Sequence, residues 1–112
     1  MFAALNLGHT VGHAVEAVAQ IPHGDAVLAG LRAMVALSVR CAGLDPAVAR
    51  MLLERIAACG PPPLPRLPRE RMHAVLAHDK KAGRFVLLRA PGVLVTCVPA
   101  AVDVNAALDA LE

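Results

Sequence analysis

Apolar residues recur every three to four positions along most of the first eighty residues, which is the periodicity of helices with one buried face. The pattern predicts helices over residues 3–19, 25–42, 45–59 and 69–80. The second of these segments is apolar around most of its circumference, so we expect it to lie at the centre of the fold.

Residues that favour turns and helix ends separate these segments. Residues 20–22 contain a proline that breaks the first helix, and Gly43 is typical of a residue just past a helix C-terminus. Asp45 followed by Pro46 is a favourable helix start, because aspartate caps the free amides and proline fits the first turn. The proline-rich residues 61–68 predict a stiff, extended spacer, which we favour over a ligand for an SH3-type domain.

The periodicity changes in the last third of the chain. Two β-prone runs, residues 84–88 and 93–98, flank a turn at residues 89–92, which predicts a two-stranded hairpin packed on the helices or on a partner. A short closing helix is expected over residues 103–111. The predicted fold class is mainly α, with a small β-hairpin near the C-terminus, in a single domain over residues 1–112.

Composition narrows the class of protein. Of the 112 residues, 57% are hydrophobic but only 2% aromatic, so we expect close packing of small residues and some apolar surface that faces a partner. A net charge of +2 is too mild to argue for a nucleic-acid partner, and no basic run is interleaved with aromatic residues, so we expect none. Three widely spaced cysteines without a CxxC motif, and no signal peptide, predict a cytoplasmic protein. The longest apolar stretch contains Arg32 and is too short to span a membrane.

The candidate chemistry is concentrated in three early histidines. His9 and His13 are four residues apart and therefore share one face of a helix, and His23 follows a short break. Such a set suits a divalent metal, a phosphate group or proton transfer, and spacing alone does not say which histidines bind metal. Gly8 and Gly12, four apart on the same helix, allow either close helix packing or the approach of a ligand.

The later histidines and lysines give weaker signals. His73 is expected at the surface of its helix. His78 precedes the pair Lys80-Lys81, which on its own is more typical of a solvated helix end than of an anion site.

Several motifs together resemble a known family. Residues 6–16 read NLGHTVGHAVE, residues 23–27 read HGDAV, residues 79–81 read DKK, and a β-prone run follows at residues 85–88. Their order and most of their spacing closely resemble the C-terminal domain of 3-dehydroquinate synthase, in the sugar-phosphate cyclase superfamily. The resemblance implies a helical, metal- and substrate-binding domain that works with an N-terminal NAD-binding domain or subunit.

The resemblance also implies an activity and its cofactors. Members of the family convert 3-deoxy-D-arabino-heptulosonate 7-phosphate to 3-dehydroquinate in the shikimate pathway of aromatic amino acid biosynthesis, with elimination of phosphate. They use NAD and a divalent metal, zinc or cobalt. By position, His9 and His23 match the family's two histidine metal ligands.

Substrate contacts are implied in the same way. Asn6 and His13 match residues that contact the sugar phosphate, and His13, toward the phosphate end, is the implied catalytic residue. One lysine of the pair Lys80 and Lys81 matches a substrate-binding lysine, with Lys81 the preferred position. This implication reverses the interpretation of the pair as a solvated helix end.

The chain departs from the family at several positions. Phe2 stands where the family has a substrate-binding arginine, and Asp25 where it has glutamate. The family's third metal ligand, a more N-terminal glutamate, and its NAD-binding glycines have no counterpart in this sequence, so we expect the chain to be inactive alone. Alternatives are the same domain of a secondary-metabolism cyclase, such as a 2-deoxy-scyllo-inosose or epi-valiolone synthase, or a non-catalytic helical remnant. A homodimer is also possible on this interpretation.

Overall fold

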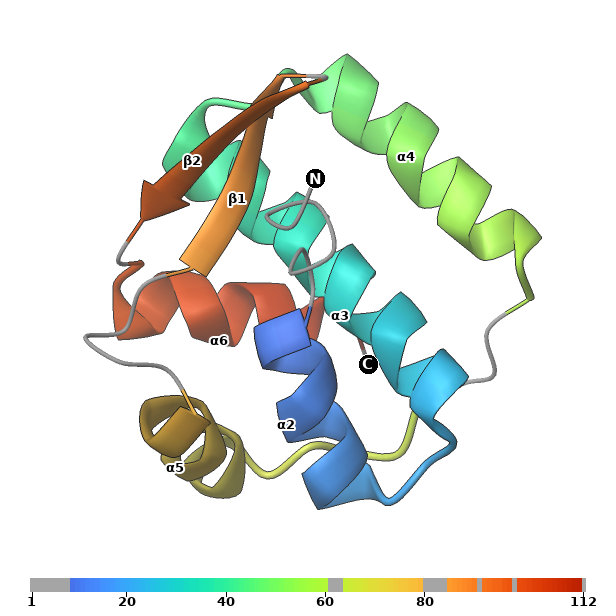
Figure 1. Ribbon diagram of the computed structural model, residues 1–112, viewed down its shortest axis with the longest axis vertical. Helices are drawn as coiled ribbons and strands as arrows, with labels where there is room; N and C mark the ends of the chain where they lie inside the picture. The colour runs from blue at the N-terminus through green and yellow to red at the C-terminus, as the bar shows by residue number, and fades with distance from the viewer. Residues whose placement is uncertain (1–8, 61–63, 80–84, 91, 98, 112) are drawn as a thin grey trace.

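Helices form most of the molecule, and a two-stranded hairpin lies near its C-terminus (Figure 1). The computed structural model describes residues 9–60, 64–79, 85–90, 92–97 and 99–111. The elements in chain order are α2 (His9–Ala19), α3 (His23–Leu37), the π-helical turn η1 (Ser38–Ala42), α4 (Pro46–Ala58), α5 (Arg69–Asp79), β1 (Phe85–Ala90), β2 (Val93–Cys97) and α6 (Ala101–Asp109). The predicted fold class, mainly α with a small hairpin, is confirmed.

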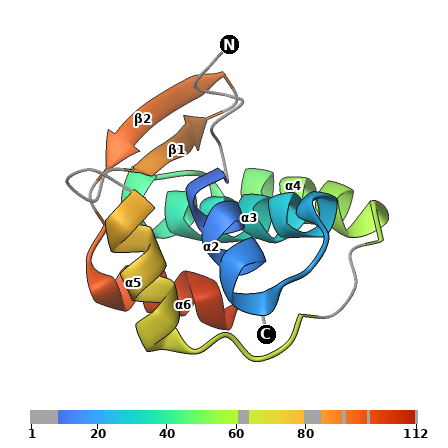
Figure 2. The same cartoon turned by 60° about the horizontal axis from the view of Figure 1, so that its bottom comes forward.

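Helix α3 is the central element, as its apolar circumference predicts. It contacts α2, α4, α6 and β1, and Figure 1 shows it running diagonally through the middle of the molecule. Turning the molecule shows the hairpin above the end of α3, with α5 below the hairpin and α4 on the opposite side (Figure 2). Small residues of α3 such as Ala26, Ala29 and Ala33 are buried, which lets the neighbouring helices approach closely.

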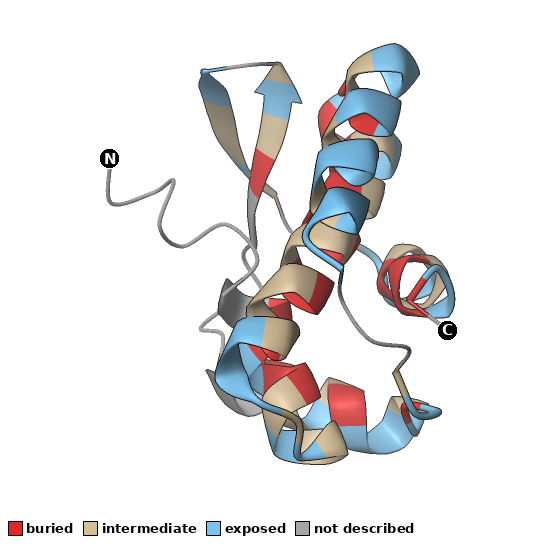
Figure 3. Cartoon of the chain, turned by 90° about the vertical axis from the view of Figure 1, so that its right-hand side faces the viewer, coloured by how far each residue is buried: buried red, intermediate tan, exposed pale blue. Residues whose placement is uncertain are grey.

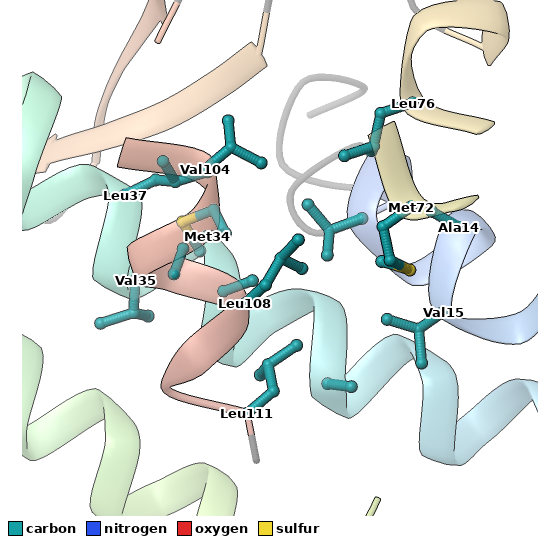
Figure 4. Close-up of a cluster of buried hydrophobic side chains, with 14 of the residues drawn as sticks. Ala14, Val15, Met34, Val35, Leu37, Met72, Leu76, Val104, Leu108 and Leu111 are labelled. Atoms are coloured by element: carbon teal, nitrogen blue, oxygen red, sulfur yellow. The ribbon is translucent and has the colours of Figure 1, made fainter. Parts of the chain in front are cut away.

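One apolar core joins α2, α3, α5 and α6 (Figure 4). Val15, Leu37, Met72 and Leu108 are each less than 2% exposed and come from these four helices in turn. Burying a side chain of this size stabilises the fold by about 1.5–3 kcal/mol. The core therefore holds in place the helix pair α2–α3, on which the candidate histidines lie.

The hairpin is attached to the helices through a buried serine. Ser38, at the start of η1, is fully buried; its hydroxyl donates to the carbonyl of Met34 at 2.7 Å and accepts from the amide of Leu88 at 2.9 Å. The strands pair antiparallel with Leu87 opposite Val95, and the register shifts after Leu88. This serine satisfies an amide of β1 next to the irregular part of the ladder.

Several predicted helix ends are confirmed. The Asp45 carboxylate accepts from the amide of Ala47 at 2.8 Å and caps α4. Gly43 and Gly60 have φ of 80° and 71°, the left-handed conformation that glycine adopts without strain. The predicted start of the first helix at residue 3 and the end of the fourth at residue 80 lie outside the described residues.

Other boundaries were predicted wrongly. Helix α3 starts at His23 rather than residue 25, because extended Pro22 is its N-cap and proline fixes the backbone there. It also ends in a π-helical turn, which apolar periodicity does not distinguish from an α-helix. Arg89 and Ala90 belong to β1 rather than to the turn, and α6 starts at Ala101 rather than residue 103.

Part of the apolar surface is exposed, including residues of α4, most of which faces solvent (Figure 3). Ala49 is the buried residue of this helix. Met51 and Leu53 on this helix are 44% and 38% exposed. An open hollow of about 450 Å³ lies beside it, lined by residues of α3, α4 and the chain after α6. That a partner covers such surface stays a prediction. None of the helices in the described part of the chain has the length and apolar character needed to cross a membrane.

Candidate metal and substrate site

Helix α2 carries a polar row opposite its buried face. Positions 9, 13, 16 and 20 are separated by four, three and four residues, so they lie within one narrow stripe of the helix. Val11, Ala14 and Val15 occupy the other side and are buried. The core therefore fixes the rotation of α2 and directs His13, Glu16 and Gln20 away from the interior.

The α2–α3 pair crosses closely at Gly12. A Cβ atom added at this position would lie 3.1 Å from the carbonyl oxygen of Ala26 in the first turn of α3. Of the two interpretations of the glycine pair, close helix packing is confirmed at Gly12, whereas Gly8 lies outside the described residues. The crossing holds the start of α3 beside α2.

A three-residue connection brings His23 back to α2. The amide of Gln20 donates to the carbonyl of Glu16 at 2.9 Å, and Gln20 has φ of 55°, which turns the chain sharply. Pro22 then starts α3, accepting from the amide of Ala26 at 3.0 Å. His23 consequently lies at the first position of α3, next to the last turns of α2.

His23 contacts the polar row through Glu16. Its Nδ1 lies 2.9 Å from Oε1 of Glu16, with the two side chains 61% and 39% exposed. An ionised carboxylate only accepts hydrogen bonds, so this contact favours the form of the ring with its hydrogen on Nδ1. In the neutral ring, Nε2 then holds the lone pair that can bind a metal ion.

The structure describes only some of the remaining predicted site residues. His13 is exposed and lies one turn before Glu16 in the polar row. His9 is the first residue of α2, and its side chain lies outside the described part of the structure. Asn6, Lys80 and Lys81 fall outside the described residues, as does Phe2.

The described residues do not by themselves form a complete metal centre. Within this part of the chain, no three His, Cys, Asp or Glu side chains are grouped so that they could hold an ion. His23 meets α2 at Glu16, two turns and about 10 Å along the helix from position 9. The chemistry of an exposed imidazole with its Nδ1 bonded to a carboxylate nevertheless fits a metal ligand, since ligating histidines usually have such a partner.

Asp25 lies half-buried in the first turn of α3. A negative charge at this end of a helix is favourable, because the free amides of the first turn carry partial positive charge. The shorter aspartate side chain at this position is therefore compatible with the helix start.

Two contacts made by histidine side chains were not predicted from the sequence. Glu16 received no role, although its spacing of three residues from His13 places it on the same helix face. His73 was wrongly expected to be a plain surface residue: it is half-buried, with its Nε2 2.6 Å from Oδ1 of Asn105 on α6. No local signal connects positions 73 and 105, which meet only through packing.

Comparisons with known proteins identify the family. A family model described as 3-dehydroquinate synthase C-terminal matches residues 2–82. The chain belongs to this family. The matched range includes α2, α3, their connection and the Glu16–His23 contact.

Individual 3-dehydroquinate synthases agree with this assignment. The protein of Leptospira interrogans (serovar copenhageni) is 36% identical over 102 residues, which cover 85% of this chain and 28% of that protein. The Lactiplantibacillus plantarum protein is 43% identical over 81 residues, covering 69% of this chain and 22% of its own length. A bifunctional shikimate kinase/3-dehydroquinate synthase of Thermotoga maritima is 32% identical over 90 residues, which cover 80% of this chain and 18% of that protein. The chain thus spans less than a third of each of these curated relatives.

Proposed function

We propose that residues 1–112 form the metal- and substrate-binding domain of a 3-dehydroquinate synthase-like enzyme. The complete enzyme converts 3-deoxy-D-arabino-heptulosonate 7-phosphate to 3-dehydroquinate and phosphate, as a lyase of the shikimate pathway. NAD is bound mainly by an N-terminal domain or subunit that pairs with this one, and the chain is inactive without it. Family membership and the names of the relatives support this proposal.

The observation that carries the proposal is the α2–α3 corner, by which we mean the end of α2 from His13, the connection at residues 20–22 and the start of α3 at His23. The connection returns His23 to the polar row of α2, where it contacts Glu16 one turn from exposed His13. One imidazole and one carboxylate thus meet at the surface of a helix pair whose other side is core, with the exposed His13 one turn away on α2. Such a surface can bind a ligand shared with a second domain.

His9 and His23 are the residues that hold the divalent metal in this proposal, with zinc or cobalt as the ion. When bound, the metal supplies Lewis-acid polarisation of the hydroxyl group that is oxidised. Catalytic zinc sites generally use three protein ligands. A ligand from the N-terminal part therefore completes the site, and we expect weak metal binding by this chain alone.

His13, Asn6 and the pair Lys80-Lys81 hold the sugar phosphate in this proposal. A lysine ammonium supplies a positive charge for the phosphate, and the asparagine amide can both donate to and accept from sugar hydroxyls. His13 is exposed on α2, and an imidazole can act as a general acid, so it can donate a proton to the departing phosphate. His13 is the proposed catalytic residue on this ground.

The names of the relatives favour a 3-dehydroquinate synthase over a cyclase of secondary metabolism, because those reported above all carry that name. The three cysteines are free thiols, which fits the proposed cytoplasmic location. We propose no nucleic-acid or membrane partner, and a homodimer is the expected self-association if one forms.

Reconstitution tests the proposed activity. The chain is mixed with the N-terminal half of a 3-dehydroquinate synthase, zinc and NAD, and phosphate release from the heptulosonate phosphate is followed. We expect release with the unaltered chain and with His73→Gln, whose histidine lies on α5 away from the corner. His9→Ala and His23→Ala should abolish it. Release by the unaltered chain that is no higher than by these two variants contradicts the catalytic proposal.

A further inference from the structure

The contact between Glu16 and His23 joins two elements at a fixed place. Glu16 lies in the last two turns of α2, and the backbone around it is held by its own carbonyl, which accepts from Gln20. His23 is held at the first position of α3, whose first turn packs closely against α2 at Gly12. The two side chains therefore meet because the helix pair brings them together.

We propose that Glu16 is a positioning residue that sets the tautomer and direction of the His23 ring. This inference rests on the proposed function, in which His23 is a metal ligand. The carboxylate accepts from Nδ1 at 2.9 Å and thereby leaves the lone pair on Nε2, at the opposite side of the ring. A free imidazole can carry its hydrogen on either nitrogen and rotates about two bonds, so the contact removes both freedoms.

Because both side chains are partly exposed, the Glu16–His23 contact matters more for orienting the His23 ring than for stabilising the fold. With side chains 61% and 39% exposed, the ion pair or hydrogen bond is screened by water and contributes little to folding. Its effect on a bound ion is different, because a carboxylate on the far nitrogen fixes the ring and raises the basicity of the ligating nitrogen. Loss of such a partner typically weakens metal binding about 10- to 100-fold.

The metal-free chain tests the tautomer directly. Long-range proton–nitrogen NMR spectra, recorded at a pH where imidazole is neutral, report which ring nitrogen of His23 carries the hydrogen. We expect Nδ1–H in the unaltered chain and in Glu16→Gln, whose amide oxygen can still accept. Glu16→Ala should lose this preference. A hydrogen on Nε2 in the unaltered chain, or an unchanged spectrum in Glu16→Ala, overturns the proposal.

Zinc titration of the same proteins separates the charge from the hydrogen bond. We expect affinity to fall at least about tenfold in Glu16→Ala and by a smaller factor in Glu16→Gln, which keeps the tautomer without the negative charge. Glu54→Ala, which removes an exposed carboxylate from α4, is the matched control and should leave affinity unchanged. Equal affinity of Glu16→Ala and the unaltered chain contradicts the positioning role. If the tautomer is as expected but the unaltered chain binds no zinc even at millimolar concentration, the assignment of His23 as a metal ligand in the proposed function fails and the Glu16–His23 pairing stands.

Discussion

Cys41 in η1 has an unusual environment for a thiol in a chain with three cysteines. Burial raises its pKa above the ordinary value of 9.0, and the nearby carboxylate of Asp103 raises the pKa further by charge and by a hydrogen bond. The guanidinium of Arg40, 2.9 Å from the same carboxylate, acts in the opposite direction. At neutral pH the thiol therefore stays protonated and a weak nucleophile.

Thiol reactivity should follow from this. We expect Cys41 to react with a maleimide more slowly than exposed Cys59. Its rate should keep rising with pH above 9.0, because the thiolate forms late. Asp103→Asn removes the charge that raises the pKa and should speed the reaction at Cys41 several-fold without affecting Cys59. Mass spectrometry of peptides measures both rates; equal rates for Cys41 with and without the substitution would show that Asp103 has no such effect.

Individual side chains were predictable as chemical types, but their partners were only partly predictable. The spacing of His13 and Glu16 could have placed both on one helix face, since helical geometry alone fixes that relation. The contacts His73–Asn105 and Arg40–Asp103 join positions 32 and 63 residues apart. They depend on how α6 packs, which no local pattern encodes.

At the scale of elements, the crossing of α2 and α3 depends on the missing side chain of Gly12. Alanine here gains up to about 1 kcal/mol of helix propensity, but its Cβ would lie 3.1 Å from a carbonyl oxygen of α3. We expect these effects to cancel approximately in Gly12→Ala. Gly12→Val should destabilise the fold by about 1–3 kcal/mol, because a larger side chain pushes the helices apart.

Gly24, in the first turn of α3, is the matched control. A Cβ added there meets nothing within 4 Å, so Gly24→Ala should leave stability unchanged or raise it by up to about 1 kcal/mol. Urea unfolding of the three variants gives the comparison. If Gly12→Val is as stable as Gly24→Ala, close packing at the crossing does not matter for the fold.

The attachment of the hairpin to η1 can be tested at Ser38. Ser38→Ala leaves the Leu88 amide without its acceptor, and we expect a loss of about 1–3 kcal/mol in the free energy of unfolding. Thr96→Ala, on the exposed side of β2, should cost less than about 1 kcal/mol. Chemical denaturation measures both, and a Ser38→Ala variant as stable as Thr96→Ala contradicts the role assigned to the hydroxyl.

Elements were predictable where a local rule determines them. Asp45-Pro46 starts α4 as expected, because a cap and a fixed proline φ act within a few residues. The shift of α3 to His23 follows from Pro22, which was interpreted only as a helix breaker. Two irregularities were not predictable: the π-helical turn at residues 38–42 and the register shift after Leu88. Both lie where Ser38 connects η1 to β1, and the pattern of apolar residues does not indicate such a contact between elements.

At the scale of the whole molecule, the chain is a helical domain with its candidate site at one corner. It spans less than a third of the relatives reported above. In the proposed function, the third metal ligand and the NAD site come from another part of the enzyme. The imidazoles of His13 and His23 are exposed at the surface of the α2–α3 pair, where a second domain can complete the site. The family motifs, rather than composition, made this interpretation possible.

The most direct test of the account is the response of the five histidines to zinc in the chain alone. Side-chain NMR spectra, recorded during a titration to millimolar zinc, resolve each imidazole separately. We expect the ring nitrogens of His9 and His23 to shift together, and those of His73 and His78 not to follow them. A response confined to His73 or His78, or none at any histidine, would contradict the assignment of the α2–α3 corner as a metal site.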